Sequence, residues 1–172
     1  PPSAWPHAAQ DIGAMDAEGF LSITDRKKDL IKTSGGKFIA PQPIENSLKH
    51  NPLVAEAVVL GDKRKFPAVL IAPAFSVLEH WAGSHQIPFA NRQELIANPE
   101  VRALFDEIVG EINKNLARFE KLKKVLLVDD EFSPENGTLT ASMKLRRRSV
   151  ENRYAKEIEG MYSRADLNSV ET

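Results

Sequence analysis

The chain has 172 residues, of which 42% are hydrophobic and 27% charged, and its formal net charge is −1. This length and composition are those of one globular domain, with room for a small piece of a second one. The lack of cysteine excludes disulfides, zinc–thiolate sites and thiol nucleophiles. The charge balance gives no overall attraction to nucleic acid or anionic membrane. No apolar run reaches the roughly 20 residues of a membrane-spanning helix.

The N-terminal region begins with a proline-rich stretch and continues into a hairpin pattern. Residues 1–10 show no hydrophobic period, so we expect irregular structure and a start that lies inside a longer chain. Apolar residues at 11–13 and 20–23 predict two antiparallel strands. Gly19 supplies the positive φ that the return needs.

A second hairpin and a charge cluster follow. Residues 30–32 and 37–39 are the expected strands, joined around Ser34-Gly35-Gly36. The cluster Asp25-Arg26-Lys27-Lys28-Asp29 lies between the two hairpins. A charged joint between two small sheets favours a domain boundary, which divides the chain into residues 1–27 and 28–172.

The middle of the chain predicts a small sheet. A short helix at 44–50, prepared by Pro41-Gln42-Pro43, precedes it. Residues 54–60 and 68–72 are β-rich and are expected to pair antiparallel across a charged turn. Residues 125–128 are expected to form a third strand.

The remaining patterns are helical. A short helix is expected at 75–81, followed by a loop at 83–92. Asn98 is a suitable N-cap for a long helix whose apolar spacing of three and four continues to Phe119. A terminal helix is expected at 150–161, with irregular structure at 163–172. The predicted class is α+β, with β-hairpins and a three-stranded sheet packed by amphipathic helices.

Two stretches near the first domain boundary suit an anionic ligand. Arg26 presents a guanidinium fork for a phosphate or a hydroxyl pair, and Asp11 could accept hydrogen bonds from the hydroxyls of a ribose. A solvated charged turn is the alternative. Gly35-Gly36-Lys37 does not fit a phosphate loop, because no upstream glycine stands at the required offset and Phe38 follows the lysine. It is either a flexible hairpin turn or a close backbone approach to a ligand.

A third basic stretch lies near the C-terminus. Without interleaved aromatic residues, Arg146-Arg147-Arg148 favours exposed arginines at the start of a helix over a nucleic-acid patch. Lys144, after a threonine-containing turn, is suited to serve as a mobile point charge for a phosphate. The scattered histidines assemble neither a metal site nor a catalytic triad.

Several of these stretches resemble one known family. The segment G-F-L-S-I-T-D-R-K-K-D-L-I-K-T-S-G-G-K-F-I-A-P, with D-I-G before it and I-E after it, is similar to the hinge region of acyl-adenylate-forming enzymes, and in detail to that of long-chain fatty acyl-CoA synthetases. The later V-V-L-G-D and N-G-x-L-T-x-x-x-K-L-x-R segments follow in the family order. The resemblance covers roughly residues 10–162. The family usually has T-G before Asp11, where this chain has Ala9-Gln10.

The resemblance implies a two-step ligase. A fatty acid and ATP, with Mg²⁺, would give acyl-AMP and pyrophosphate, and coenzyme A would then displace AMP. This chain would be the small C-terminal domain, which swivels between the steps, joined to the last hairpin of the large N-terminal adenylation domain. That domain, the fatty acid and coenzyme A are the implied partners, and the chain alone is expected to be inactive and to hold no cofactor.

The resemblance also implies roles for single residues. Asp11 matches the aspartate that binds the nucleotide ribose, and Arg26 matches the arginine that assists it. Lys28 takes the hinge position. Gly35-Gly36 resembles the turn that lines the coenzyme A channel, with Lys37 nearby. Lys144 matches the lysine that reaches the carboxylate and the α-phosphate during adenylation.

Two other classes remain open. One is an adenylating domain for a different carboxylic acid or within a multidomain synthase, and the other is an interaction module without catalysis. The expected location is cytoplasmic, with peripheral attachment to a membrane left open. We expect no nucleic acid, metal or transmembrane segment on this chain.

Overall fold

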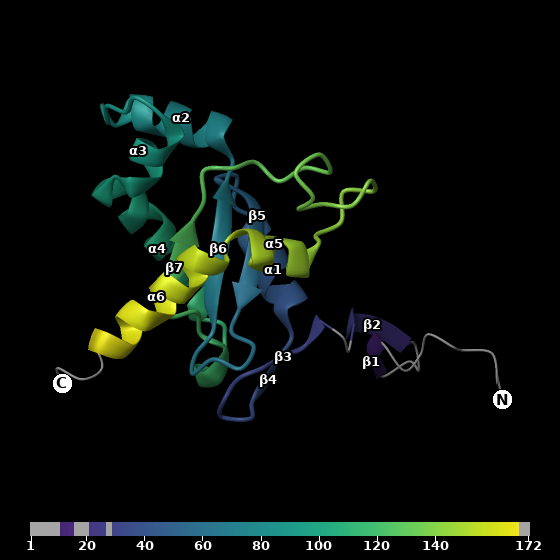
Figure 1. Ribbon diagram of the computed structural model, residues 1–172. Helices are drawn as coiled ribbons and strands as arrows, with labels where there is room; N and C mark the ends of the chain where they lie inside the picture. Colours follow the sequence, from purple (N-terminus) through teal and green to yellow (C-terminus); the bar gives the residue numbers. More distant parts are fainter. Residues whose placement is uncertain (1–10, 16–20, 27–28, 169–172) are drawn as a thin grey trace.

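A computed structural model describes residues 11–15, 21–26 and 29–168, with side chains described from residue 29 to residue 164 (Figure 1). The strands are β1 (Asp11–Met15), β2 (Leu21–Arg26), β3 (Ile31–Lys32), β4 (Phe38–Ile39), β5 (Val54–Leu60), β6 (Ala68–Pro73) and β7 (Val125–Leu127). The helices are α1 (Pro41–Lys49), α2 (Phe75–Ser84), α3 (Arg92–Ala97), α4 (Pro99–Asn113), α5 (Arg147–Arg153) and α6 (Ala155–Asn168), with a 3-10 turn, η2, at Arg118–Glu120.

A three-stranded sheet in the order β5-β6-β7 forms the centre of the molecule. β5 pairs antiparallel with β6, with Val59 opposite Val69, as the sequence predicts. β7 then pairs with β6 in parallel, with Leu126 opposite Leu70. Within the described part of the chain, this order leaves β5 as an edge strand, and one row of its backbone groups has no strand partner there.

Helices cover both faces of this sheet (Figure 1). Side chains alternate along β6, so Val69 and Ile71 pack with α1 to α4, whereas Leu70 packs with α5 and α6. Phe75 and Phe105 are the largest fully buried side chains, and both belong to the core on the side of α1 to α4. The three-stranded sheet, the hairpins and the amphipathic helices confirm the predicted α+β class.

The two predicted hairpins are present as separate two-stranded sheets. β1 pairs antiparallel with β2, and their loop lies outside the described residues. β3 pairs antiparallel with β4. The loop after β5 supports this second hairpin, because the Lys63 amide donates to the Lys32 carbonyl over 2.8 Å and the Ser34 amide donates to the Arg64 carbonyl over 2.9 Å.

Between residues 83 and 119 one helix was not predicted and one prediction was wrong. Helix α3 begins at Arg92, where the expected loop ends, because the Asn91 side chain accepts from the Glu94 amide over 2.9 Å and the Glu94 carboxylate accepts from the Ala90 amide. Helix α4 ends at Asn113 instead of continuing to Phe119. The Asn113 side-chain amide bonds both backbone groups of Leu122, which turns the chain back toward β7.

The C-terminal helix also differs from the prediction. It is divided at Tyr154, whose backbone departs from helical geometry. The Tyr154 hydroxyl donates to Asp130 over 2.9 Å, and burial together with this bond raises the pKa of the phenol to about 12. Helix α6 continues to Asn168, so the irregular structure expected from residue 163 begins no earlier than residue 169.

None of the described helices is both long and apolar enough to cross a membrane. Nor do the described residues include a group of three or more His, Asp or Glu side chains arranged to hold a metal ion.

The core between α4 and the sheet predicts unequal effects for two phenylalanines. Phe105 is fully buried, whereas Phe119 is 41% exposed. Phe105→Ala should lower the free energy of unfolding by about 3–5 kcal/mol, because it leaves a cavity in the core. Phe119→Ala, the matched control, should cost about 1 kcal/mol or less. Urea unfolding measures both, and equal losses would contradict the packing described here.

Candidate functional site

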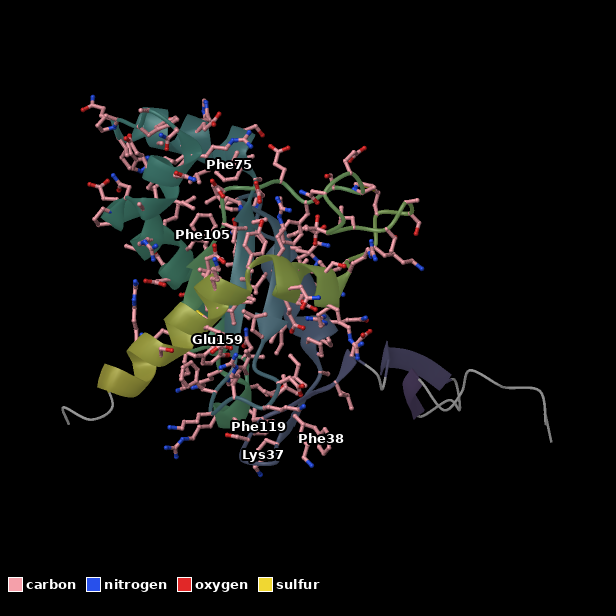
Figure 2. The ribbon with its side chains drawn as sticks, in the orientation of Figure 1. Lys37, Phe38, Phe75, Phe105, Phe119 and Glu159 are labelled. Atoms are coloured by element: carbon pink, nitrogen blue, oxygen red, sulfur yellow. The ribbon has the colours of Figure 1, made fainter. Side chains whose placement is uncertain are left out.

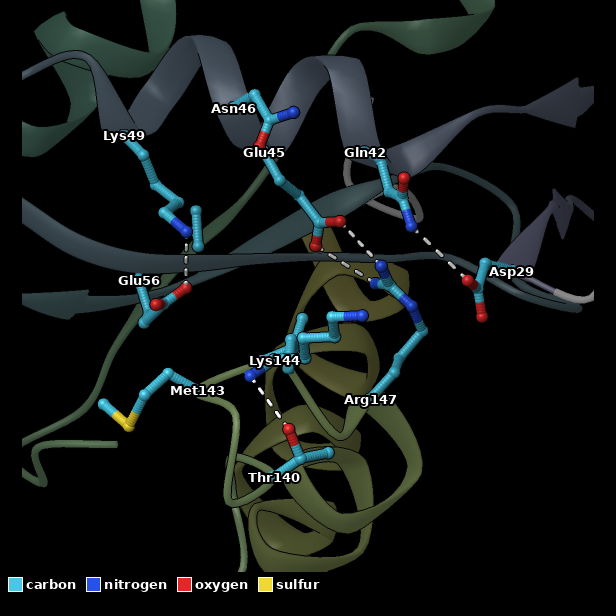
Figure 3. A pocket seen from close by; sticks show the side chains of 12 residues that line it. Asp29, Gln42, Glu45, Asn46, Lys49, Glu56, Thr140, Met143, Lys144 and Arg147 are labelled. Atoms are coloured by element: carbon cyan, nitrogen blue, oxygen red, sulfur yellow. Dashed lines mark hydrogen bonds and ion pairs between the residues drawn. The ribbon is translucent and has the colours of Figure 1, made fainter. Parts of the chain in front are cut away.

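A cleft of about 620 Å³ lies between α1, β5 and the loop that precedes α5 (Figure 3). Acidic, basic and amide side chains line most of it. The lining residues are Asp29, Gln42, Glu45, Asn46, Lys49, Glu56, Ala57, Thr140, Met143, Lys144, Leu145 and Arg147. In Figure 3, α1 borders the cleft on one side, and Thr140, Met143 and Lys144 border it on the other.

Lys144 lies on a tight turn that backbone and side-chain hydrogen bonds hold closed. Leu139 and Leu145 form an antiparallel bridge at the base of the turn. The Thr140 amide donates to the Lys144 carbonyl over 2.7 Å, and the Thr140 hydroxyl accepts from the Lys144 amide over 3.0 Å. Met143 has a φ of 66°, a left-handed conformation that costs a non-glycine residue free energy. The closed turn therefore fixes where the lysine leaves the backbone.

The buried residue Thr138 holds the base of this turn in place. Thr138 is fully buried, and its hydroxyl bonds the Ser133 amide, the Ser133 carbonyl and the Asn136 side chain. Gly137, at a φ of 80°, allows the chain to turn between Asn136 and Thr138. These bonds satisfy the polar groups of a loop that would otherwise be mobile.

Lys144 is exposed, and its ammonium group forms no ion pair with any described residue. By contrast, the other lysine of the cleft, Lys49, is bound to Glu56 at 3.1 Å. An unneutralised ammonium on a rigid turn is suited to an incoming phosphate or carboxylate oxygen, because its charge is not already used by a carboxylate. The predicted point charge therefore lies at the edge of a cleft.

The rear of the cleft is formed by a buried ion pair that sequence analysis missed. Arg147 Nη2 donates to Glu45 Oε1 over 2.6 Å, and Nη1 donates to Glu45 Oε2 over 3.1 Å. Both side chains are largely buried, at 16% and 6% exposure. Burial alone would lower the pKa of the Arg147 guanidinium, but the hydrogen bonds and charge of Glu45 raise it overall. The expectation of exposed arginines was therefore wrong for Arg147.

The ion pair also satisfies the open edge of the sheet. The Val59 amide donates to Glu45 Oε2 over 3.0 Å, and the Val59 carbonyl accepts from Arg147 Nη1 over 3.1 Å. Both groups belong to edge strand β5, where a further strand would otherwise be needed. At Val59, the Glu45 carboxylate and the Arg147 guanidinium thus make the two hydrogen bonds that a neighbouring strand would make.

The sequence contained a signal for this pair. Glu45 stands beside Ile44 and three residues before Leu48, on the face of α1 that packs in the core. Arg147 stands three residues before Val150, on the buried side of α5. An acid on one buried helix face and a base on another predict a pairing, because neither can be buried alone.

The Gly35-Gly36 turn lies apart from the cleft, at the end of the molecule labelled by Lys37, Phe38 and Phe119 in Figure 2. Gly36 has a φ of 83°, and its amide donates to the Thr33 carbonyl over 2.9 Å. Lys37 Nζ lies 5.6 Å from the centre of the Phe119 ring. The structure therefore does not bring this turn and Lys144 together.

The predicted nucleotide residues are described only by their backbones. Asp11 and Arg26 are direct partners across β1 and β2. This register places the two Cα atoms opposite each other. Lys28 lies outside the described residues.

The family of the chain follows from a comparison with known protein families. Residues 28–166 match the family described as AMP-binding enzyme C-terminal domain. The chain belongs to this family.

Curated members of this family include fatty acid ligases. The AMP-binding C-terminal domain described here is 35% identical over 155 residues to a long-chain-fatty-acid–CoA ligase of Mycobacterium tuberculosis, which covers 90% of this chain and 26% of that protein. It is 36% identical over 167 residues to long-chain-fatty-acid–CoA ligase 1 of Schizosaccharomyces pombe, which covers 94% of this chain and 25% of that protein. The chain thus spans about a quarter of the length of these relatives.

Solved structures share the fold. The A domain of a carboxylic acid reductase from Segniliparus rugosus, in complex with AMP and a carboxylic acid, superposes with a TM-score of 0.74 at 23% identity. The match covers 91% of this AMP-binding C-terminal domain and 23% of that structure. At this identity the likeness shows the fold alone.

The backbone of the Gly35-Gly36 turn predicts unequal effects for two alanine substitutions. Gly36→Ala should lower the free energy of unfolding by about 1–2 kcal/mol, because the left-handed φ strains a residue that carries a Cβ. Gly35→Ala, whose added Cβ would only touch Thr33 Oγ1 at 4.0 Å, should change stability by about 0.5 kcal/mol or less. Urea unfolding compares them, and a larger loss for Gly35→Ala would contradict the turn geometry.

Proposed function

We propose that this chain is the C-terminal domain of an ATP-dependent long-chain fatty acid–CoA ligase. The observation that carries the proposal is the 35–36% identity to proteins of that name over at least 90% of the chain. Because the relatives are about four times longer, the activity belongs to a complete ligase, by which we mean this chain joined to the N-terminal part that its relatives carry. The chain contributes the adenylation lysine and the coenzyme A channel turn.

In the first half-reaction, Lys144 acts on the charge of the reacting groups. A carboxylate oxygen attacks the α-phosphorus of ATP, the bond to pyrophosphate breaks, and acyl-AMP forms. Negative charge is concentrated where the two anions meet, and the free ammonium of Lys144 lowers the free energy of that arrangement. The closed turn around Thr140 supports this role, because it fixes the point at which the lysine leaves the backbone.

In the second half-reaction, the thiol of coenzyme A gives up its proton to water and its sulfur attacks the acyl carbonyl. The thioester forms as the bond to AMP breaks, and AMP leaves with the electrons of that bond. The Gly35-Gly36 turn lines the path of the thiol arm, with Lys37 beside it. Because this turn and Lys144 lie apart on one domain, they serve the same active site only if the domain rotates between the steps. We place the hinge at Lys28, between the segment 1–27 and the domain 28–172.

The nucleotide is held from the other side of that hinge. Asp11 binds the ribose hydroxyls and Arg26 assists it, which is supported by their pairing across β1 and β2. ATP, Mg²⁺ and coenzyme A bind where the two domains meet. The described residues hold no group of three or more acidic or histidine side chains arranged for a metal ion. The N-terminal part of the complete ligase is the partner of the chain.

Two alternatives are separated by simple assays. A complete ligase that adenylates a short or aromatic acid better than a long-chain acid would assign the chain to another adenylating enzyme. Submicromolar binding of ATP or coenzyme A to this chain alone would favour an independent binding module, since half of each site should be missing. A ligase at work in the cytoplasm, with or without peripheral membrane contact, fits the proposal.

The role of Lys144 predicts a selective defect. In the complete ligase, Lys144→Ala should slow acyl-AMP formation by about 100-fold or more, because it removes a charge that acts in the transition state. Thioester formation from supplied acyl-AMP should be largely unchanged. Pyrophosphate release measures the first step and thioester formation the second.

The control for this variant is the second lysine of the cleft. Lys49 is already neutralised by Glu56, so Lys49→Ala should leave both half-reactions within a small factor of the wild type. An equal loss of both half-reactions in Lys144→Ala would refute the assignment of Lys144 to adenylation.

A further inference from the structure

The Glu45–Arg147 ion pair connects the two segments to which function is assigned. Glu45 belongs to α1, the helix that directly follows the hairpin with the Gly35-Gly36 turn. Arg147 is the first residue of α5 and stands three residues after Lys144. The pair is thus the side-chain contact between the helix behind the channel turn and the helix behind the adenylation lysine (Figure 3).

Stability alone is a weak reason for such a pair. Removing two charges from water costs about as much as their attraction returns, and an apolar pair of similar volume often stabilises a protein as well. Apolar side chains, however, do not fix the orientation of their neighbours as hydrogen bonds do. Four hydrogen bonds join Glu45, Arg147 and the backbone of Val59, and together they fix the guanidinium plane against edge strand β5.

Because the connection between Arg147 and Lys144 is short, the fixed position of Arg147 also restricts Lys144. Only Leu145 and Arg146 separate the two residues, and the Arg146 amide donates to the Thr138 carbonyl over 2.9 Å. The turn is therefore held at its base by the bond to Thr138 and, one residue further along the chain, by Arg147. If Arg147 lost its fixed position, the base would remain, but the angle of the turn toward the cleft would no longer be set.

We propose that Glu45 and Arg147 are positioning residues for Lys144, which hold its turn at the angle that adenylation requires. This inference rests on the function proposed above and adds to it two residues that do not touch the substrate. The pair acts only on the step that uses Lys144. The channel turn lies before the first residue of α1 and keeps its own support from the loop after β5.

The chain contains a matched control pair on the same helix. Arg153, in the last turn of α5, donates to Asp130 Oδ2 through Nε over 3.2 Å and through Nη2 over 2.9 Å. This pair also joins an arginine of α5 to a carboxylate, but it lies at the end of the helix that points away from Lys144. Both side chains are about 40% exposed.

The test compares Arg147→Lys with Arg153→Lys in the complete ligase. Each variant keeps the positive charge and loses the planar fork. Both half-reactions are measured, together with thermal unfolding, at a temperature well below the midpoint of the less stable variant. The turnover number and the KM for ATP are determined separately for acyl-AMP formation.

Arg147→Lys should lower the turnover number of acyl-AMP formation by about 10- to 100-fold, because a displacement near 1 Å has effects of this size. Its KM for ATP and its rate of thioester formation from acyl-AMP should stay within about twofold of the wild type, as should every rate of Arg153→Lys. Glu45→Gln should show the same selective loss, and the double variant Glu45→Gln/Arg147→Lys should be little worse than either single one.

Three results would overturn the inference. They are equal rates for Arg147→Lys and Arg153→Lys, a loss shared equally by the two half-reactions, and additive losses in the double variant. If Arg147→Lys is too unstable to assay, the two half-reactions of Glu45→Gln decide the question. A selective loss of acyl-AMP formation would support the proposal, and an equal loss of both half-reactions, or no loss, would refute it.

Failure of this inference is distinguishable from failure of the proposed function. If Lys144→Ala leaves acyl-AMP formation intact, the function assigned to the lysine is wrong. If Lys144→Ala shows its selective defect and Arg147→Lys does not, the function stands and the positioning role is wrong.

Discussion

The arrangement of this domain depends on the ion pair between Glu45 and Arg147 at the open edge of the sheet. A three-stranded sheet leaves one edge of β5 without a strand, and Val59 there needs both a donor and an acceptor. One carboxylate and one guanidinium supply them and neutralise each other in the same place. Helices α1 and α5, which are about a hundred residues apart in the chain, are thereby joined across the strand.

The fold also keeps apart the two turns to which we assign a function. The Lys144 turn precedes α5, which the ion pair anchors, whereas the Gly35-Gly36 turn precedes α1 and is held by the loop after β5. Backbone hydrogen bonds within each turn fix its local shape, and the packing of α1 and α5 on one sheet fixes their separation. A rotation of the whole domain can then exchange one turn for the other at a common site without changing either.

Most of the fold could be predicted from local sequence patterns, and the predictions that were wrong failed for physical reasons. Strands β5 and β6 could be predicted because long β-rich runs end at Gly61 and Pro73. The end of α4 could not, because the apolar spacing continues to Phe119 while a single side chain, Asn113, turns the chain. Among the candidate site residues, Lys144 is indicated by the resemblance to a family motif, whereas the run of charged residues predicts a solvated Arg147. The burial of Arg147 can be inferred only from its pairing with Glu45, about a hundred residues earlier in the chain.

The central claim is that the two turns belong to one rigid body that rotates as a unit. Because the chain has no cysteine, spin labels can be placed on it at Phe38→Cys and Met143→Cys, both of which are exposed positions. A third label on the N-terminal part of the complete ligase reports rotation. Pulsed electron paramagnetic resonance should give the same Phe38–Met143 distance with acyl-adenylate alone and with coenzyme A added, while the distance from Met143 to the N-terminal part changes. A shift in the Phe38–Met143 distance, or no change in the other, would contradict the account.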